Sequence, residues 1–435
     1  MASGVSTRKE RIWRRQAENT GGENHSVSDR ALWVLIGLLR FVVQPVAQLR
    51  IALVHCRNTG RFLSTTEFHL RQRAYRGDSS ATLDVFVSGT PINKYILSML
   101  SAREHVIRSD RLWRILNRLK RRYPKHPIWA DLTHTGWMQG PVWENPGPQL
   151  VLTEGMHERG AALRRELGIP EGARHVCINA RDADHRDSPD NVLDPTDYWA
   201  TDDFRNCDIA NYMKAAEYLA EEGYWVVRMG FHSPRVRLPK KRHFQILDYA
   251  SDIRPGLADP EFADMYLPAT ARFFLGCTSG LYLYASIFGV PIAYANMVPF
   301  LECGRTNNDV FIWKKCFDQN SGRYLEYADA IEAGMDSDWL SVEELQAYKR
   351  RGLEIHENSA EEILDLTRET LMRIDDKWQQ GLEENQLRED FERVFPRHGS
   401  HEHTYRGNMC TAFLRQHRRL FAKPVSDLLV SETPN

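Results

Sequence analysis

The sequence lacks most of the short motifs that assign a chain of this length to a class at once. Its seven cysteines are scattered and form no CxxC pair. This argues against a zinc site and a disulfide framework, and favours a reducing cytoplasm. No predicted first strand leads into a GxGxxG turn, so a Rossmann oxidoreductase is disfavoured, and the Walker A pattern is missing as well. The class must therefore be inferred from the order of the predicted elements.

The chain also has little net charge and no long hydrophobic run. With 57 basic and 58 acidic residues, no nucleic-acid partner is expected, although the first 125 residues are basic and residues 326–392 are acidic. The longest apolar core, residues 31–39, is far shorter than the roughly 20 residues that a spanning helix needs. We expect residues 31–48 to form an amphipathic helix that either contacts a membrane surface or packs on its own domain. The polar residues 1–30 before it are expected to be disordered.

What the sequence does have is an alternation of apolar strands and helices, and it runs twice. The strand-like "LDVFVSG" precedes the helical "PINKYILSMLSAR", and later "HVCINAR" and "WVVRMG" flank another helix. Such alternation predicts parallel sheets with helical crossovers. We expect an α/β fold class with two Rossmann-like doubly wound domains that face a cleft, at residues 49–160 and 161–325, followed by a helical C-terminal extension at 326–435.

The stretch "FFLGCTSGLYLYASIFGVPIAYAN", residues 273–296, places small polar residues between two apolar segments. We expect a strand that ends near Leu275 and a helix that starts near Gly280, so that the turn lies at the carboxyl end of the sheet. Free backbone N–H groups and the hydroxyls of Thr278 and Ser279 would then cradle a phosphate. The alternative is a tight turn that needs small residues, with Ser279 as a helix cap.

A second polar cluster, "INARDADHRD" at residues 178–187, also follows a predicted strand. Arg181 suits an anion, and Asp182 and His185 are candidate acid/base groups. The alternative is a solvated charged loop. The Asp-Ala-Asp spacing matches a metal-binding triplet of some sugar transferases, but short matches arise by chance and no metal is expected. Arg228 and Gly230, which end the next strand, are expected beside this loop.

Two further segments of the first half could face the same cleft. Asn58 and Gly60 form a tight turn after the first strand, and Asn93 and Lys94 follow the second strand. We expect these four residues on the acceptor side. An exposed helix lysine, however, is more often only solvated. Near the other end, Ser359 and Glu362 have the spacing of a helix capping box.

These segments in this order resemble a known family. The run "SGLYLYASIFGVPIAYAN" resembles the donor-binding half of two-domain sugar transferases of the GT-B type, including the heptosyltransferase-like members. The chain from about residue 50 to 420 is similar to a family of bacterial glycosyltransferases. The segments that carry this similarity are "INKYILSML", "VCINARD", "RNCDIANYMKAAEYLAEEGYWVVRMG", "DMYLPATARFFLGCTSGLYLYASIFGVPIAYAN" and "NSAEEILDLTRETL". It departs from the family at "CRNTGRF", where many members carry a Gly-His pair, which leaves the catalytic base of the first domain open.

The resemblance implies a metal-independent glycosyltransferase, without a cofactor, that moves a sugar from a nucleotide-sugar donor to a glycan or lipid-linked acceptor. It further implies a cytoplasmic protein, with a peripheral position at the inner face of the membrane as an option. The alternatives are an epimerase-like enzyme that acts on sugar nucleotides and an inactive scaffold on the same fold. By resemblance the donor pocket would be lined by Arg181, Asp182, Arg228, Gly230, Thr278, Ser279 and Gly280.

Overall fold

The computed structural model describes most of the chain and divides it into two compact units. The described residues are 27–77, 82–132, 140–182, 204–230, 236–240, 242–298, 300, 304–335, 347–395 and 406–423. The first unit comprises Met1–Cys56, Gly77–Pro91 and Leu100–Leu132, and the second comprises Arg57–Arg76, Ile92–Met99 and Thr133–Asn435. The expected tail lies outside the described residues as far as residue 26, and the expected domain bounds stay predictions.

The first unit contains a three-stranded parallel sheet in the order β1-β2-β3. Its strands are β1 (Gln48–Leu53), β2 (Thr82–Ser88) and β3 (His105–Arg108). An isolated parallel bridge joins Ile51 to Trp129 on the free side of β1, where a full Rossmann order would place a fourth strand. Two doubly wound domains are therefore not confirmed, because only this one bridge extends the first sheet beyond β1.

Two helices belong to the first unit. α5 (Asp110–Arg122) begins after Ser109, whose hydroxyl accepts the N–H of Leu112 at 3.2 Å, and it buries Leu116 and Leu119 against the sheet. The expected helix at residues 31–48 is α2, which spans Val27–Val43. It ends earlier than expected because Pro45 follows and disfavours a helical conformation at the residue before it.

The second unit contains a seven-stranded sheet in the order β13-β9-β8-β7-β4-β5-β6, and every neighbouring pair is parallel. From β6 to β9, this is the strand order 3-2-1-4-5-6 of a doubly wound Rossmann sheet. The predicted α/β class with parallel sheets is thus confirmed. The strands are β4 (His175–Asn179), β5 (Trp225–Arg228), β6 (Ile246–Leu247), β7 (Phe274–Gly276), β8 (Ile292–Met297), β9 (Val310–Trp313) and β13 (Asn408–Met409).

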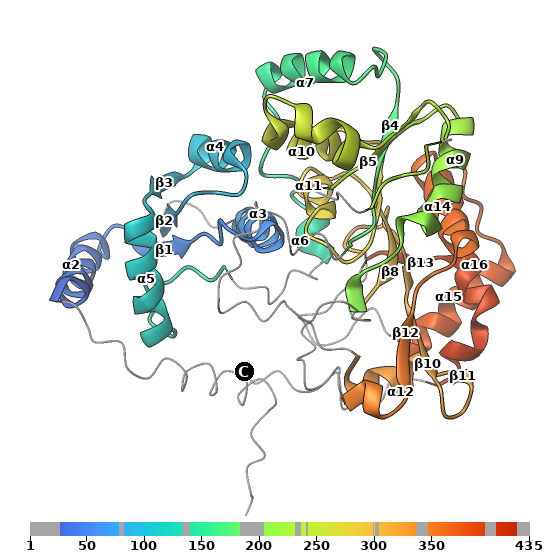
Figure 1. The fold of residues 1–435 in the computed structure, drawn as a ribbon. Helices are drawn as coiled ribbons and strands as arrows, with labels where there is room; N and C mark the ends of the chain where they lie inside the picture. Colours follow the sequence, from blue (N-terminus) through green and yellow to red (C-terminus); the bar gives the residue numbers. More distant parts are fainter. Residues whose placement is uncertain are drawn as a thin grey trace, which may run out of the picture. The chain divides into compact units, whose positions relative to one another are not determined.

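Helices cover both faces of this sheet, so every residue of β4 and β8 is buried (Figure 1). One layer contains α3 (Thr59–Arg76), α6 (Gly140–Glu144), α7 (Glu154–Glu166), α10 (Pro260–Ala269) and α11 (Tyr282–Ser286). The other contains α9 (Met213–Glu221), α14 (Ala360–Ile374), α15 (Leu382–Val394) and α16 (Thr411–Gln416). The first half of α4 (Lys94–Arg103) is grouped with this unit.

The carboxyl-terminal region is mainly helical, but it also contributes strands. β13 extends the main sheet beside β9. A small antiparallel sheet forms from β10 (Lys315–Asp318), β11 (Arg323–Tyr324) and β12 (Leu353–His356). The predicted capping box of α14 is confirmed: the Ser359 N–H donates to the Glu362 carboxylate at 2.7 Å, and the Glu362 N–H donates to the Ser359 hydroxyl at 3.3 Å.

Candidate functional site

The strand order of the main sheet reverses between β4 and β7. These strands are neighbours, with Asn179 at the end of β4 opposite Gly276 at the end of β7. From β4 the order runs outward through β5 and β6, and from β7 it runs in the opposite direction through β8 and β9. Ligands of open α/β sheets bind outside the carboxyl ends of the strands at such a point. The candidate site is therefore formed by the residues that follow β4 and β7.

The residues after β7 form the turn that the sequence singled out. The Thr278 hydroxyl accepts the N–H of Val298 at 3.2 Å and donates to Met297 Sδ at 3.6 Å. The Ser279 hydroxyl donates to Asn179 Oδ1 at 3.1 Å, and so joins the turn to the end of β4. Asn179 is held in turn by its own donation to the carbonyl oxygen of Met229 at 3.0 Å. Both hydroxyls therefore fix the shape of the turn.

The backbone of this turn presents unused donors. The N–H groups of Thr278, Ser279 and Gly280 donate to no other residue in the described part of the chain. The helix that follows, α11, has only five residues and starts at Tyr282, slightly later than expected. Its dipole is correspondingly small, so a bound anion would be held by the N–H groups themselves more than by the helix.

Gly280 is required by a close approach of two backbones. A Cβ at Gly280 would lie 3.0 Å from the backbone nitrogen of Gly60 and 3.2 Å from the Cβ of Thr59. The first turn of α3 is thus packed directly on the turn after β7. The predicted acceptor-side residue Gly60 and the predicted donor-side residue Gly280 are brought together, both within the second unit.

The residues after β4 lie against the same turn. The N–H of Arg181 donates to Cys277 Sγ at 3.2 Å, and its guanidinium donates to Asn206 Oδ1. Asp182 lies 3.7 Å from the Arg228 guanidinium, measured from Oδ2 to Nη2. The other predicted acid/base group, His185, lies outside the described residues. The structure therefore brings Arg181 and Asp182 to the candidate site, and their predicted roles stay predictions.

Arg228 and Gly230 have packing partners of their own. Arg228 is buried, and its Nη1 donates to Asp248 Oδ1, to the Ser251 hydroxyl and to the carbonyl oxygen of Val236, each at 2.9 Å. A Cβ on Gly230 would lie 2.9 Å from the Cβ of Ala250. Arg228 thus has a buried carboxylate as its partner, and Gly230 makes room for the segment after β6.

Lys314 belongs to this site and was not predicted from the sequence. It directly follows β9, is 2% exposed, and donates from Nζ to the carbonyl oxygen of Asn206 at 2.6 Å. No carboxylate among the described residues lies within ion-pair distance of it. Burial lowers its pKa most. The thiols of Cys207 and Cys277 and the Glu357 carboxylate raise the pKa in part, and Arg181 lowers it. Asn206 therefore accepts hydrogen bonds from two cations, Arg181 and Lys314. In the sequence, the only sign of Lys314 was its position directly after the apolar run "VFIW".

Two buried thiols lie beneath the turn. A hydrogen bond from Cys207 lowers the pKa of Cys277 to about 7, against the effect of burial, with smaller contributions from the Arg181 N–H and from Lys314. The same hydrogen bond, together with burial, raises the pKa of Cys207 well above its usual value. The hydrogen bond from Cys207, the Arg181 N–H and the charge of Lys314 thus all favour the thiolate form of Cys277.

The remaining predicted acceptor-side residues act as helix caps or tethers. Asn58 caps α3, with Oδ1 accepting the N–H of Arg61 at 2.9 Å. Asn93 caps α4 and donates to the carbonyl oxygen of Glu261 at 2.8 Å. Lys94 pairs with Asp259 at 3.1 Å. Asn93 and Lys94 therefore contact the start of α10, and only Asn58 and Gly60 lie on the element that reaches the turn.

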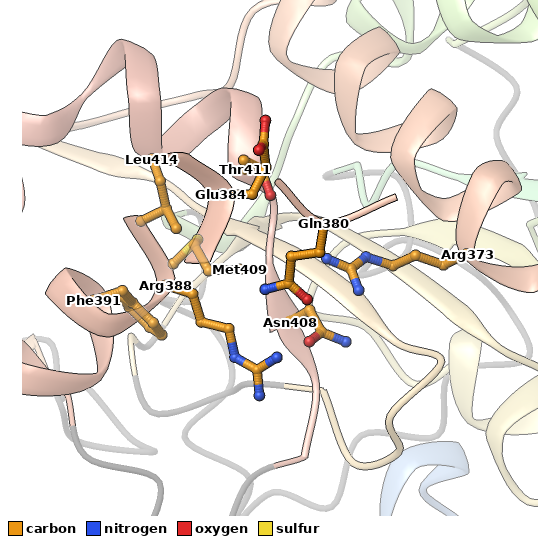
Figure 2. A pocket seen from close by; sticks show the side chains of 9 residues that line it. All are labelled: Arg373, Gln380, Glu384, Arg388, Phe391, Asn408, Met409, Thr411 and Leu414. Atoms are coloured by element: carbon orange, nitrogen blue, oxygen red, sulfur yellow. The ribbon is translucent and has the colours of Figure 1, made fainter. Parts of the chain in front are cut away.

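Other parts of the described structure offer weaker sites. In the described ranges, no group of three or more His, Cys, Asp or Glu residues is arranged to hold a metal ion, and the expectation of metal-independent action stays a prediction. A small cavity lies among α14, α15, α16 and β13, where Arg373, Arg388 and Asn408 line it (Figure 2). Its arginines already pair with Glu369 and Glu392. This cavity is therefore not a candidate for the binding of an anion.

Comparisons with known proteins give a fold-level likeness. No family model matches the chain, and no curated protein matches it. Solved structures of glycosyltransferases are similar to it. Those similar include a family 9 glycosyl transferase from Veillonella parvula, with 13% identity, a TM-score of 0.35 and coverage of 57% of this chain and 80% of that chain.

A second similar structure is the iron-containing dodecameric glycosyltransferase TibC from enterotoxigenic E. coli, with 14% identity, a TM-score of 0.30 and coverage of 57% of this chain and 58% of that one. A third is ADP-heptose LPS heptosyltransferase II from E. coli, with 13% identity, a TM-score of 0.32 and coverage of 57% and 84%. At these values the likeness does not by itself assign a function to this chain.

Proposed function

We propose that the protein is a glycosyltransferase whose nucleotide-sugar donor binds outside the carboxyl ends of β4 and β7. One observation carries the binding site: at the reversal of the strand order, the turn after β7 has three backbone N–H groups that donate to no other described residue, and Arg181 packs against that turn. Donor groups of this kind suit the two phosphates of a nucleoside diphosphate. Sugar transfer, as opposed to another reaction of a nucleotide, is supported by the resemblance of the sequence motifs.

The residues of the site divide the work as follows. The N–H groups of Thr278, Ser279 and Gly280 hold one phosphate, and Arg181 neutralises charge on the diphosphate. Lys314 adds a buried positive charge from the end of β9. As the bond between the sugar and the diphosphate breaks, negative charge grows on the leaving diphosphate, and fixed donors of this kind stabilise it without reorganisation. This is how the chain would act without a metal ion.

The acceptor hydroxyl must lose a proton during transfer, and a carboxylate or an imidazole can take it. We assign this role to Asp182 or His185, as the sequence analysis does. The acceptor is a glycan or a lipid-linked saccharide, and the protein acts in the cytoplasm. Domain closure over the donor would keep water from hydrolysing it.

Calorimetric titration of the protein with a panel of nucleoside diphosphates and nucleotide sugars tests the donor site. It is run first in EDTA and then in magnesium. One nucleotide family should bind in EDTA, and Ser279→Asp should weaken that binding at least about tenfold, because it places a negative charge at the phosphate site. Two matched variants serve as controls. Ser279→Ala removes the hydroxyl that bonds Asn179 but adds no charge, and so separates the effect of the charge from the loss of that hydrogen bond. Ser101→Asp adds the same charge at an exposed position of α4.

The outcomes of the titration distinguish a donor site from a turn that only packs, and an active transferase from an inactive scaffold. Binding by the wild type and both controls but not by Ser279→Asp supports the donor site. Equal binding by all four proteins, or no binding by the folded wild type, contradicts it and leaves the turn as a packing device. Tight nucleotide binding without turnover on any acceptor would favour the inactive scaffold.

A further inference from the structure

Helix α2 has two apolar faces, and only one of them is packed. Leu32, Trp33, Ile36 and Val43 lie against the core of the first unit. The opposite face carries an apolar stripe at helical spacing that is open to solvent. Its members are Val34, Leu35, Leu38, Leu39, Phe41 and Val42, and Val46 continues it just beyond the helix. We refer to these seven residues as the α2 stripe.

The α2 stripe is too concentrated to be ordinary surface. The described part of the chain exposes fifteen large hydrophobic residues, and seven of them form the α2 stripe. The other eight are spread over the rest of the described residues, as single exposed apolar side chains usually are. Contiguous exposed apolar surface of this kind marks an interaction site.

A row of arginines lies on the neighbouring helix of the same unit. Exposed residues recur along α5 at helical spacing: Arg111, Arg114, Arg118, Arg121 and Arg122. Aromatic contacts join this helix to α2, since Trp33 stacks on Tyr123 with ring centroids 4.7 Å apart. The guanidinium of Arg122 lies over the Tyr123 ring at 5.5 Å. The apolar stripe and the basic row therefore belong to one packed body.

The chemistry of this pair of helices favours one occupant. An apolar stripe beside arginines complements a surface with an apolar interior and an anionic rim, which is an anionic phospholipid bilayer. A second copy of the chain, paired through the same face, would bring two arginine rows together and so repel. None of the described helices is long and apolar enough to cross a membrane. A helix of the length of α2 can instead lie in the interface.

We propose that the first unit docks on anionic phospholipid through α2. The α2 stripe inserts at the boundary between headgroups and acyl chains, and the α5 arginines bind lipid phosphates. Trp33 and Tyr123, which stack on each other, join the two helices on the packed face of α2, opposite the α2 stripe. This inference stands independently of the proposed transferase activity, because it uses none of the residues of the donor site.

Vesicle co-sedimentation of the full chain tests the proposal. Vesicles of phosphatidylcholine alone are compared with vesicles of phosphatidylcholine and phosphatidylglycerol in equal parts, at low and at high salt. The wild type should bind the mixed vesicles at least about tenfold better than the neutral ones, with a loss at high salt. Leu38→Gln combined with Phe41→Gln should weaken binding to the mixed vesicles at least about tenfold.

Matched controls separate the surface from general effects of the substitutions. Phe244 and Leu382 are 75% and 91% exposed in the second unit, against 76% for Phe41 and 60% for Leu38. Phe244→Gln with Leu382→Gln should therefore bind vesicles like the wild type. Arg111→Glu with Arg121→Glu should remove the preference for the anionic lipid, and Arg165→Glu with Arg350→Glu, at exposed sites of the second unit, should keep it. Circular dichroism and thermal melting check that each variant is folded.

Three results would overturn the proposal. The first is a folded wild type that binds neither kind of vesicle. The second is an α2 variant that binds the mixed vesicles as well as its control does. The third is a dimer in sedimentation equilibrium that the α2 variant dissociates, without any vesicle binding, which would make a second copy the occupant. None of these results affects nucleotide binding in calorimetry, so the two proposals fail separately.

Discussion

Two consecutive lysines of the second unit are both buried, and their surroundings differ. Lys315 donates from Nζ to the carboxylate of Glu362, which also contacts the imidazole of His417. Lys314 donates to a backbone carbonyl oxygen, that of Asn206, and has no carboxylate partner among the described residues. Lys315 therefore has a hydrogen-bonded carboxylate partner, and Lys314 has none among the described residues.

This difference separates structural cations from candidate ligands. A buried charge costs several kcal/mol unless a partner offsets it. Arg228 resembles Lys315 in this respect, since its partner Asp248 is also buried. The charge of Lys314 lies near Arg181, Cys277 and the Glu357 carboxylate, which offsets part of it, and under the proposed function an anion from outside the chain would offset the rest. To judge whether a cation at a strand end could bind a ligand, its position is therefore less informative than whether the fold already holds its counter-ion.

The largest loss of stability is expected when the buried ion pair of Arg228 with Asp248 is broken. Arg228→Leu leaves the Asp248 carboxylate buried without its cation, and should lower the free energy of unfolding by about 3–5 kcal/mol. Urea unfolding measures the loss. Asp182→Asn, which removes the partner 3.7 Å away, should cost far less. If Arg228→Leu were as stable as the wild type but failed to bind nucleotide, Arg228 would be a donor ligand, as the sequence predicts.

The buried pair of Lys315 with Glu362 predicts that the stability of the fold depends on pH. Burial alone would raise the pKa of Glu362, but hydrogen bonds from His417 and Lys315 outweigh it and bring the pKa to about 2, from 4.5. Because the folded-state pKa is depressed, the carboxylate stabilises the fold above about pH 4.5. This stabilisation, at most about 3 kcal/mol, is lost as the pH falls toward 2. Glu362→Gln should therefore be less stable than the wild type at neutral pH, and the difference should shrink in acid.

Urea midpoints measured from neutral to acid pH test this expectation. The exposed pair of Glu383 with Arg415 supplies the control. Glu383→Gln should not comparably change the way the urea midpoint falls in acid, because exposed pairs are screened by solvent. A difference between Glu362→Gln and the wild type that stays constant with pH would show that the carboxylate does not stabilise the fold through its charge.

Substitution of Lys314 should have the opposite effect to substitution of Lys315: it should lower the affinity for nucleotide and not the stability. Lys314→Met removes a buried cation that forms no ion pair with a carboxylate among the described residues, so the protein should be as stable as the wild type or more so. Its affinity for nucleoside diphosphate should fall about 10- to 100-fold, the usual range for a lost charged hydrogen bond. Lys315→Met is the matched control, with lower stability and unchanged affinity. Calorimetry and urea unfolding on both variants would contradict the comparison if the two lysines behaved alike.

Much of the second unit could be predicted from the sequence, because its central strands are continuous apolar runs. β4, β5, β7 and β8 follow directly from such runs between helices, and the small polar residues after β7 indicate where the site begins. The capping box of α14 is equally local. Where the signal lay within a few neighbouring residues, the sequence was sufficient.

The other features depend on contacts between distant residues. β13 has two residues, and only its pairing with β9, nearly a hundred residues earlier, makes it a strand. The partner of Arg228 is Asp248, which no local pattern connects to it. Lys314 was missed because β9 itself was not predicted, and a lysine after an unrecognised strand has no assigned place. The packing of Gly60 on Gly280 joins segments more than two hundred residues apart.

The contact of Gly60 with Gly280 gives the smallest expected effect on stability, and it tests whether packing holds the turn of the candidate site in shape. A methyl group at Gly280 would press on the backbone of Gly60 at 3.0 Å, so Gly280→Ala should cost about 1–3 kcal/mol of stability and weaken nucleotide binding as the turn shifts. The same group at Gly60 meets nothing closer than 3.4 Å and lies in the first turn of α3. Gly60→Ala should therefore be neutral, or stabilising by up to about 1 kcal/mol.

Thermal unfolding and calorimetry on the two alanine variants measure these effects. Since both substitutions add one methyl group to the same contact, their difference reports on geometry alone. Equal losses in both variants would mean that α3 and the turn adjust to each other, so that the backbone of Thr278 to Gly280 is not held rigid. Its N–H groups could then not be held in advance for a phosphate. A loss confined to Gly280→Ala, in stability and in affinity together, would tie the shape of the turn to the binding of its ligand.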